Sequence, residues 1–313
     1  MKEQKINISF DVEDIYGDQK LLNNTLFDLL TFCDENKIYV DVYISAIKLP
    51  FLSEDIINLL QESKYLIPGY HSNSHSFLTI PEQNSLEELE KSEEYTFDVD
   101  TEKLTEKKGG IHSYLKYFSP TIFRCPGYCW TPDYFEFMEK YRFNSTTIDI
   151  DYAEIFSYKG ITVVPTLIKA LEKITDYDDL DLSLQSFSIK SVYLHPARLI
   201  YNHFWDKMKK NSYHIITDRN IYPNMNKRIK LIKDLLLYLK NNYTLFSVAD
   251  VKFQKEQQKS DDLKFLTNKL RESMVSKWGW SQILQPINKT YHLNKLETDT
   301  LFTGKMEEHA DEL

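Results

Sequence analysis

Polar and apolar side chains follow two different periods along residues 5–253. Residues 5–10 alternate polar and apolar positions and lead into an acidic cluster, which predicts a strand that delivers carboxylates to its end. Residues 21–36 place apolar side chains at helical spacing. The same signals predict strands at 39–45, 65–70, 121–123, 146–150, 160–165, 191–194 and 243–248, and helices at 53–63, 85–90, 131–141 and 228–239. Strands that alternate with helices favour an α/β fold with parallel strands.

Other stretches lack a clear period. We interpret residues 91–110 as a polar loop, the acidic segment Asp176–Asp181 as a solvated loop, and 199–226 as a long loop near a site. These stretches lie between predicted strands and helices and do not change their alternating order.

The last part of the chain differs from the rest. Residues 255–260 form a polar linker, and one helical stripe follows, made of Leu263, Leu266, Leu270 and Met274. We therefore expect a barrel domain at 1–253 and, at 254–313, a C-terminal helical extension with a loose acidic tail. The stripe needs an apolar partner, because an isolated helix of this length is marginal in water. That partner is either the flank of the barrel or another subunit, for example in a homo-oligomer.

Composition narrows the classes of function. The 313 residues carry a net charge of −9, which disfavours a nucleic-acid partner. No apolar run approaches the roughly 20 residues that a membrane span needs. Three cysteines without a framework spacing fit a reducing compartment, and the C-x3-C pair Cys125 and Cys129 is read as incidental. With no apolar signal region after Met1, we expect a cytoplasmic protein.

Four short polar segments each lie at the end of a predicted strand. They are Asp11-Val12-Glu13-Asp14, His71-Ser72-Asn73-Ser74-His75, Arg124-Cys125-Pro126-Gly127 and Leu194-His195-Pro196. In a barrel of alternating strands and helices the C-terminal ends of the strands converge on one mouth, where catalytic residues gather. The chain therefore predicts a single polar site assembled from four places.

The residue types at these positions suit a metal-dependent hydrolase. Two imidazoles and one carboxylate with open positions form a common arrangement for activating water. On a helical turn His71 and His75 would lie on one side, within reach of one ion. For the carboxylate, strand alternation would place Glu13 on the same face as Asp11, whereas a turn after Val12 would bring in Asp14 instead.

The other two segments supply charge, main-chain donors and an acid. Arg124 can pair with a carboxylate and hold it ionised. Pro126-Gly127 predicts a tight turn whose main-chain N–H groups could face an oxyanion. His195 could protonate a leaving amine near neutral pH.

Taken together, the four segments resemble the polysaccharide deacetylase family, also called the NodB homology or carbohydrate esterase family 4 group. The S-F-D-V-E-D and L-H-P forms are most similar to a branch with allantoinase-like and peptidoglycan deacetylase-like members. The resemblance covers about residues 4–253. It implies a deformed (β/α)7 barrel with one divalent metal ion, usually zinc. Two features depart from the family pattern: the adjacent Asp pair is here spread over four residues, and no tryptophan-bearing motif is recognisable.

The resemblance also implies roles for individual residues. Asp11 would be the general base, His195 the general acid, and Arg124 the residue that orients Asp11. The metal ligands would be His71, His75 and a carboxylate, for which we prefer Asp14 with Glu13 as the alternative. The main chain of Gly127 or Tyr128 would contribute to an oxyanion hole.

These roles imply a carbohydrate N-deacetylase, which removes an acetyl group from an amino sugar or a sugar-containing intermediate. A cytoplasmic location favours a nucleotide- or lipid-linked sugar as the substrate. Two other functions compete: hydrolysis of a different C–N bond, in a cyclic amide or ureide, and a catalytically silent scaffold that binds a glycan or a partner protein.

Overall fold

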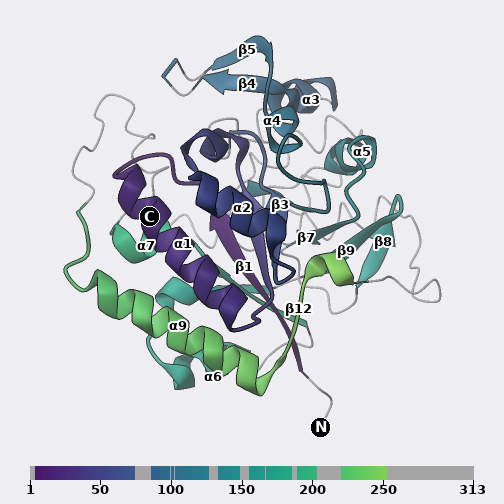
Figure 1. The fold of residues 1–313 in the computed structure, drawn as a ribbon. Coiled ribbons are helices and arrows are strands. Elements are labelled where there is room, and N and C mark those ends of the chain that lie inside the picture. Colours follow the sequence, from purple (N-terminus) through teal and green to yellow (C-terminus); the bar gives the residue numbers. More distant parts are fainter. Residues whose placement is uncertain are drawn as a thin grey trace, which may run out of the picture.

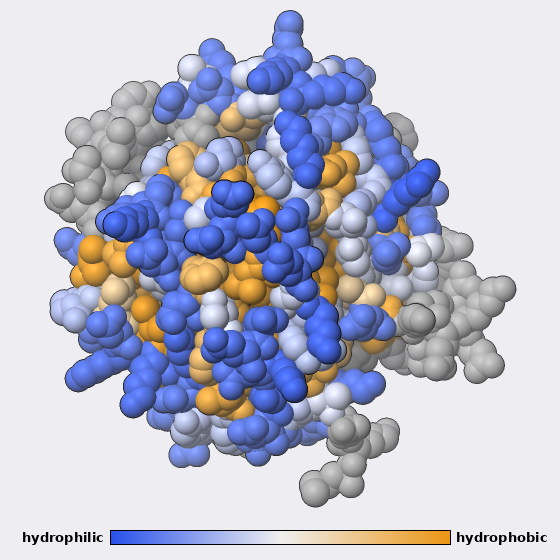
Figure 2. Space-filling view, viewed as in Figure 1, coloured by the Kyte–Doolittle hydropathy of each residue, from blue (hydrophilic) through white to orange (hydrophobic). Residues whose placement is uncertain are grey.

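The computed structural model describes residues 4–74, 86–98, 100–101, 103–126, 133–148, 155–165, 167–184, 189–202 and 220–251. The expectations for His75, for Gly127 and Tyr128 and for residues 254–313 fall outside these ranges. Among the described helices, none combines the length and the apolar character that crossing a membrane requires. Figure 2 shows one face of the molecule, on which hydrophilic residues surround smaller hydrophobic patches.

A curved, mostly parallel sheet is the centre of the fold (Figure 1). Its parallel path runs β10-β11-β1-β2-β3-β6-β7-β9, with β8 antiparallel beside β9 and β12 parallel beside β1. The strand bounds are β1 Lys5–Val12, β2 Val40–Ile44, β3 Leu66–Tyr70, β6 Ile122–Arg124, β7 Ser145–Ile148, β8 Phe156–Tyr158, β9 Ile161–Pro165, β10 Leu167–Ala170, β11 Ile189–Leu194 and β12 Thr244–Phe246.

The two ends of the parallel path are neighbours in the chain. Strand β9 ends at Pro165 and β10 begins at Leu167, so one residue separates the strand that pairs with β7 from the strand that pairs with β11. Counting β9 and β10 as one interrupted strand, seven parallel strands follow one another around a closed path. The predicted deformed (β/α)7 barrel is confirmed.

Helices surround the sheet. The α-helices are α1 Gln19–Glu35, α2 Glu54–Glu62, α3 Leu86–Glu94, α4 Ile111–Tyr114, α5 Asp133–Lys140, α6 Tyr177–Leu184, α7 Ala197–Ile200 and α9 Met225–Asn242. Short 3-10 helices are η1 Ala46–Phe51, η5 Leu171–Lys173 and η6 Val248–Asp250. Helices α1, α2 and α9 lie together on one side of the sheet (Figure 1).

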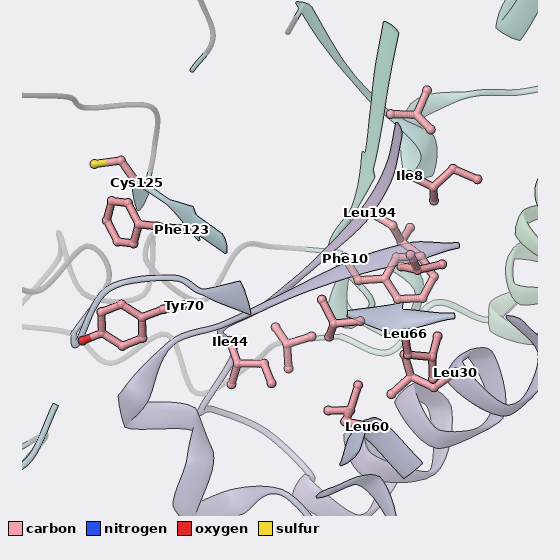
Figure 3. Packing of buried hydrophobic residues seen from close by; sticks show 14 of the residues in the cluster. Ile8, Phe10, Leu30, Ile44, Leu60, Leu66, Tyr70, Phe123, Cys125 and Leu194 are labelled. Carbon is pink, nitrogen blue, oxygen red and sulfur yellow. The ribbon is translucent and has the colours of Figure 1, made fainter. Parts of the chain in front are cut away.

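Local sequence explains how α1 starts and which face it buries. The side chain of Asp18 accepts hydrogen bonds from the main-chain N–H groups of Lys20 and Leu21, which caps the helix. Apolar residues at helical spacing then form a buried stripe that includes Leu26 and Leu30. Leu30 packs over the sheet near Phe10 of β1 (Figure 3).

Alternation along β1 separates the hydrophobic core from the inside of the barrel. The even-numbered residues Ile6, Ile8, Phe10 and Val12 belong to the main hydrophobic cluster, which includes the surrounding helices. The odd-numbered residues are polar and buried, namely Asn7, Ser9 and Asp11. Because side chains of a strand alternate between its faces, this pattern leaves a polar interior that leads towards the strand ends.

Residues 244–250 close the barrel at the end where β1 begins. Strand β12 pairs with residues 5–7 of β1, and η6 follows it. Buried Asp41 of β2 accepts hydrogen bonds from Ser247 Oγ, from the Val248 main-chain N–H at 3.0 Å and from Asn7 Nδ2 at 2.7 Å. Val248 packs against Tyr43 in the interior. The two ends of the described chain are thereby joined through one carboxyl group.

We expect Asp41 to make folding pH-dependent. Burial raises the pKa of Asp41 to about 6, although its three hydrogen-bond donors and the charge of Arg124 oppose the shift. Since the unfolded value is about 3.9, the stabilisation is complete below about pH 4 and is lost as the pH rises through about 6. Between about pH 4 and pH 7 the free energy of unfolding should fall by roughly 3 kcal/mol more than in Asp41→Asn. Denaturant titrations of both proteins measure this, and identical pH dependences would contradict it.

Two loop predictions were wrong. Strand β4, Tyr95–Asp98, pairs antiparallel with β5, Lys103–Lys108, in a hairpin where we expected a polar loop. Phe97 of the hairpin packs against Ile15 and Ile47, while β5 is mostly exposed, which explains its polar sequence. The acidic segment Asp176–Asp181 forms most of α6. Asp178 and Asp179 lie in its first turn, where the helix dipole favours negative charge.

Candidate active site

Side chains from five separate segments meet at the C-terminal ends of the strands. Strand β1 carries Asp11 near its end and is followed by the other two acids of its cluster. His71 follows β3, Arg124 is the last residue of β6, and His195 follows β11. The fifth segment is η5 after β10, which carries Glu172. All of these side chains are buried or nearly so: Asp11, Glu13, Asp14, His71, Arg124, Glu172 and His195. The predicted assembly of distant segments at one mouth is therefore present for the residues that the structure describes.

Arg124 and Asp11 form a fully buried ion pair. Arg124 Nη1 donates to Asp11 Oδ1 at 2.7 Å and to Ser9 Oγ at 2.8 Å, and Nε donates to Thr147 Oγ1 at 3.0 Å. The guanidinium also stacks on the ring of Tyr43, with 4.0 Å between Cζ and the ring centroid. One oxygen of Asp11 is thus held by the arginine, and Oδ2 faces the mouth on the side of His195.

Glu13 faces His71 across the mouth. Glu13 Oε2 lies 3.4 Å from His71 Nε2, and both side chains are almost fully buried. His71 Nδ1 lies 2.9 Å from the main-chain oxygen of Arg124, which can only accept, so Nδ1 carries the hydrogen. That tautomer directs Nε2, the nitrogen suited to a ligand or an ion pair, at the carboxylate of Glu13.

His195 lies between the carboxylates of Asp11 and Glu13 on one side and that of Glu172 on the other. Its Nε2 lies 3.9 Å from both Asp11 Oδ2 and Glu13 Oε1, and its Nδ1 lies 2.8 Å from Glu172 Oε1. Burial lowers the pKa of His195, but the hydrogen bond and charge of Glu172, followed by the charges of Glu13 and Asp11, raise it to about 9. The imidazolium form therefore predominates at neutral pH.

Sequence reasoning missed Glu172. The residue follows the short strand β10, which the pattern of apolar positions did not reveal. An acid directly after the mainly apolar run Leu167–Leu171 is the signal that could have found it. The predicted strand ended at Pro165, and no element was assigned to residues 167–170.

Asp14 has different surroundings from Glu13. Its Oδ1 accepts a hydrogen bond from the main-chain N–H of Tyr16 at 3.0 Å, within the turn that follows β1. Its charge also acts on buried Lys48, whose Nζ donates to Gln19 Oε1 at 2.8 Å. Burial lowers the pKa of Lys48 to about 8, and Asp14 partly offsets this.

A pocket of about 390 Å³ opens beside these groups. Its wall combines the polar groups of the mouth with apolar side chains of α1 and the segment after β11. The lining residues are Asp11, Val12, Glu13, Asp14, Leu22, Leu26, Lys48, His195, Pro196, Ala197 and Arg198. Asp11 and His195 therefore border a space that a small group can enter.

The described residues bring together two of the predicted metal ligands, His71 and the alternative carboxylate Glu13. Among them, no three His, Cys, Asp or Glu side chains cluster closely enough to hold an ion. Glu13 and His71 form a facing oxygen–nitrogen pair of the kind that binds zinc, and the predicted second histidine, His75, lies outside the described residues. Ser72 has a φ of 66°, so the segment after His71 does not begin as the right-handed helical turn we expected.

Comparisons with known proteins leave the family open. No family model matches the chain, and no curated protein matches it. Similar solved structures include a 4-alpha-glucanotransferase from Thermococcus litoralis, with a TM-score of 0.48 and 9% identity over 79% of this chain and 37% of that one. A family 4 carbohydrate esterase from Bacillus anthracis gives 0.36 and 16% identity over 80% and 82% of the two chains. A peptidoglycan deacetylase from Bdellovibrio bacteriovorus gives 0.39 and 12% identity over 81% and 58%.

These likenesses carry no argument for a shared activity, because each TM-score is below 0.5 and each identity is below 25%. The chain also spans only about a third of the length of the glucanotransferase. The functional argument therefore rests on the residues of the mouth.

Proposed function

We propose that the chain is a hydrolase that removes the acetyl group from an N-acetylated amino sugar or a sugar-containing intermediate. One observation carries the proposal: Asp11 and His195 face each other at the mouth, each held by a separate buried partner. Arg124 holds one oxygen of Asp11 at 2.7 Å, and Glu172 holds Nδ1 of His195 at 2.8 Å. The sequence motifs supply the substrate class, through their resemblance to polysaccharide deacetylases.

The two held groups have complementary proton-transfer roles. Arg124 pairs with Oδ1 of Asp11, which leaves Oδ2 to accept a proton from an attacking water molecule. His195 donates from Nε2, because its raised pKa keeps the ring protonated near neutral pH. The 3.9 Å between Oδ2 and Nε2 is too long for a direct hydrogen bond and allows both atoms to contact one small reacting group. Water thus loses a proton on one side while the leaving amine gains one on the other.

Glu13 and His71 are the described residues that would hold a divalent ion, with His75 as the predicted third ligand. Such an ion, when bound, lowers the pKa of a coordinated water molecule and polarises the acetyl carbonyl group. The hydrogen bond between His71 Nδ1 and the Arg124 carbonyl is the type of support that fixes a ligating imidazole. We propose Glu13, and not Asp14, as the carboxylate ligand, because Glu13 faces His71.

We expect Glu13→Gln to weaken metal binding more than Asp14→Asn does. Glu13→Gln removes the negative charge that lies 3.4 Å from His71 Nε2. Asp14→Asn keeps the side-chain oxygen that accepts the hydrogen bond from the Tyr16 main-chain N–H. Zinc stoichiometry and chelator competition on the two purified variants measure the difference. The double variant His71→Ala and His75→Ala should lose the ion altogether. A larger loss in Asp14→Asn would assign the ligand role to Asp14.

Glu172→Gln should move the alkaline limb of the rate profile to lower pH. The variant removes the charge and weakens the hydrogen bond that raise the pKa of His195, so the ring loses its proton earlier as the pH increases. Wild type should keep its activity up to about pH 9, whereas the variant should decline below that value. Initial rates across the pH range test this. An unchanged limb would mean that another group controls it.

One experiment separates the proposed function from its competitors. The full chain is purified, its metal content is determined, and acetate release is measured on a panel of N-acetylated sugars and sugar nucleotides. Acetate release that is lost in Asp11→Asn supports the proposal. Hydrolysis of cyclic amides or ureides without acetate release would replace it with the other C–N hydrolase. Metal binding with neither reaction would favour a silent binding scaffold.

A further inference from the structure

The main chain around His71 takes an uncommon path that other residues must stabilise. Ser72, directly after His71, has a φ of 66°, in the left-handed region that non-glycine residues rarely adopt. The main-chain N–H groups of Ala46 and Ile47 donate to the oxygens of Ser72 and Asn73, both at 2.9 Å. These bonds hold the carbonyl groups of the turn. The main-chain N–H of Asn73 and the hydroxyl of Ser72 bind a different partner.

That partner is Glu93, near the end of α3. Glu93 Oε2 accepts from the hydroxyl of Tyr70 at 2.7 Å and from the main-chain N–H of Asn73 at 2.8 Å, and Oε1 accepts from Ser72 Oγ at 2.6 Å. Oε1 also lies 3.3 Å from the hydroxyl of Tyr134. Glu93 is 2% exposed, so these hydrogen bonds take the place of hydrogen bonds from water to its carboxyl group. It therefore binds donors from the residue before His71 and from the two residues after it.

The segment that carries Glu93 also contacts the loop after β1. Asn73 Nδ2 donates to the main-chain oxygens of Ser92 and Tyr95, which join the His71 turn to the start of β4. Phe97 of β4 packs with Ile15, one residue after Asp14. Helix α3 and the β4–β5 hairpin stand together at one end of the molecule (Figure 1). Both loops that supply the proposed ligands are thus supported by residues 86–98.

The turn also allows little rearrangement. Gly110 has a φ of 47°, and a Cβ atom there would lie 2.0 Å from the main-chain oxygen of Glu93. The ring of Tyr70 lies beside Phe123 (Figure 3) and also packs against Tyr114. Its hydroxyl therefore reaches Glu93 from a fixed position. Gly110 therefore packs closely against the main chain of Glu93, and the packed ring of Tyr70 fixes one donor to the Glu93 carboxylate.

We propose that Glu93 is a positioning residue that aims His71 at the ion-binding position and thereby sets the affinity of the site for a divalent metal. The inference rests on the proposed metal-dependent function. Glu93 binds the side chain of Tyr70 before His71 and the main-chain N–H of Asn73 after it, and the Arg124 carbonyl fixes the ring through Nδ1. The remaining nitrogen, Nε2, is left at 3.4 Å from Glu13. Support of this kind changes metal affinity about 10- to 100-fold when it is lost.

The test is a titration of the full, metal-free chain with Zn²⁺ alone, in competition with a chelator. Glu93→Gln keeps the size of the side chain but turns one acceptor oxygen into a donor, which must face a hydroxyl or the Asn73 N–H. We expect its dissociation constant for Zn²⁺ to rise about 10- to 100-fold. Glu94→Gln is the matched control, because Glu94 is the next residue of α3 and bonds Tyr141 and Lys140 away from His71. It should bind Zn²⁺ like wild type.

A second readout separates aiming of the ligand from general stability. Co²⁺ substituted at the site should show an altered visible absorption spectrum in Glu93→Gln and an unchanged spectrum in Glu94→Gln. If Glu93→Gln does not fold, Tyr70→Phe replaces it, since that variant deletes one hydrogen bond and retains the packed ring. We expect weaker Zn²⁺ binding there as well.

The outcomes distinguish this inference from the function on which it rests. A wild-type chain that binds no divalent ion would overturn the proposed metal centre and this inference together. A wild-type chain that binds Zn²⁺, with affinity and Co²⁺ spectrum unchanged in folded Glu93→Gln or in Tyr70→Phe, would overturn the positioning role alone. In that case the metal-dependent function would stand.

Discussion

Asp11→Asn is expected to lower the turnover rate about 100-fold or more while the protein keeps its fold and its metal ion. The amide of Asn has the same shape as the carboxylate, yet it cannot take a proton from water at neutral pH. A 100-fold loss corresponds to about 3 kcal/mol in the activation barrier. The measurement is the turnover rate on the substrate that the acetate-release panel identifies, with metal content determined on the same sample.

Asp18→Asn is the matched control for this experiment. Asp18 lies seven positions further along the chain, is exposed and caps α1, and Asn is an equally good capping residue. Its turnover should equal that of wild type. Near-normal turnover in Asp11→Asn would show that Asp11 is not the base, and a further loss of metal would place Asp11 among the ligands.

Arg124→Met should lower the free energy of unfolding by about 3–5 kcal/mol. The substitution preserves much of the length of the side chain but leaves Asp11 as a buried charge without its guanidinium partner. Hydrogen bonds to Ser9 and Thr147 disappear at the same time. Denaturant unfolding at neutral pH measures the effect.

A double variant tests the cause of that loss. In Arg124→Met with Asp11→Asn the buried charge is gone as well, so part of the stability should return. A double variant that is less stable than Arg124→Met by the full cost of Asp11→Asn would contradict this explanation. The loss would then come from packing against Tyr43, over which the guanidinium lies.

The parts of the fold that follow a simple hydrophobic period could be predicted from the sequence. Strand β1 and helix α1 were predicted within two residues at each end, because each buries one regular face of side chains. The hairpin β4–β5 could not be found in this way. Of its described residues Phe97 is the one that is buried, and a single buried residue produces no hydrophobic period. Helix α6 was hidden by its acidic first turn, which resembles a solvated loop when tertiary contacts are unknown.

The same contrast applies to the candidate site. Asp11, His71, Arg124 and His195 could be predicted because each lies at a strand end, and strand ends meet in a barrel. Glu93 lies in a stretch of polar sequence, and Glu172 follows a short strand that was not predicted. Only the folded chain brings these two acids to the two histidines. Lys48 was missed for a related reason, since most lysines are exposed and nothing local marks this one as buried.

The pairing of β1 with β12 affects when the protein can fold during its synthesis. Lys5 pairs with Thr244, and Asp41 depends on donors from Ser247 and Val248. A nascent chain emerges from the ribosome starting at its N-terminus, so the early strands wait for most of the sequence before these partners exist. During that interval part of the edge of β1 is open to chaperones or to other unfinished chains. We expect the barrel to close only when translation has passed η6.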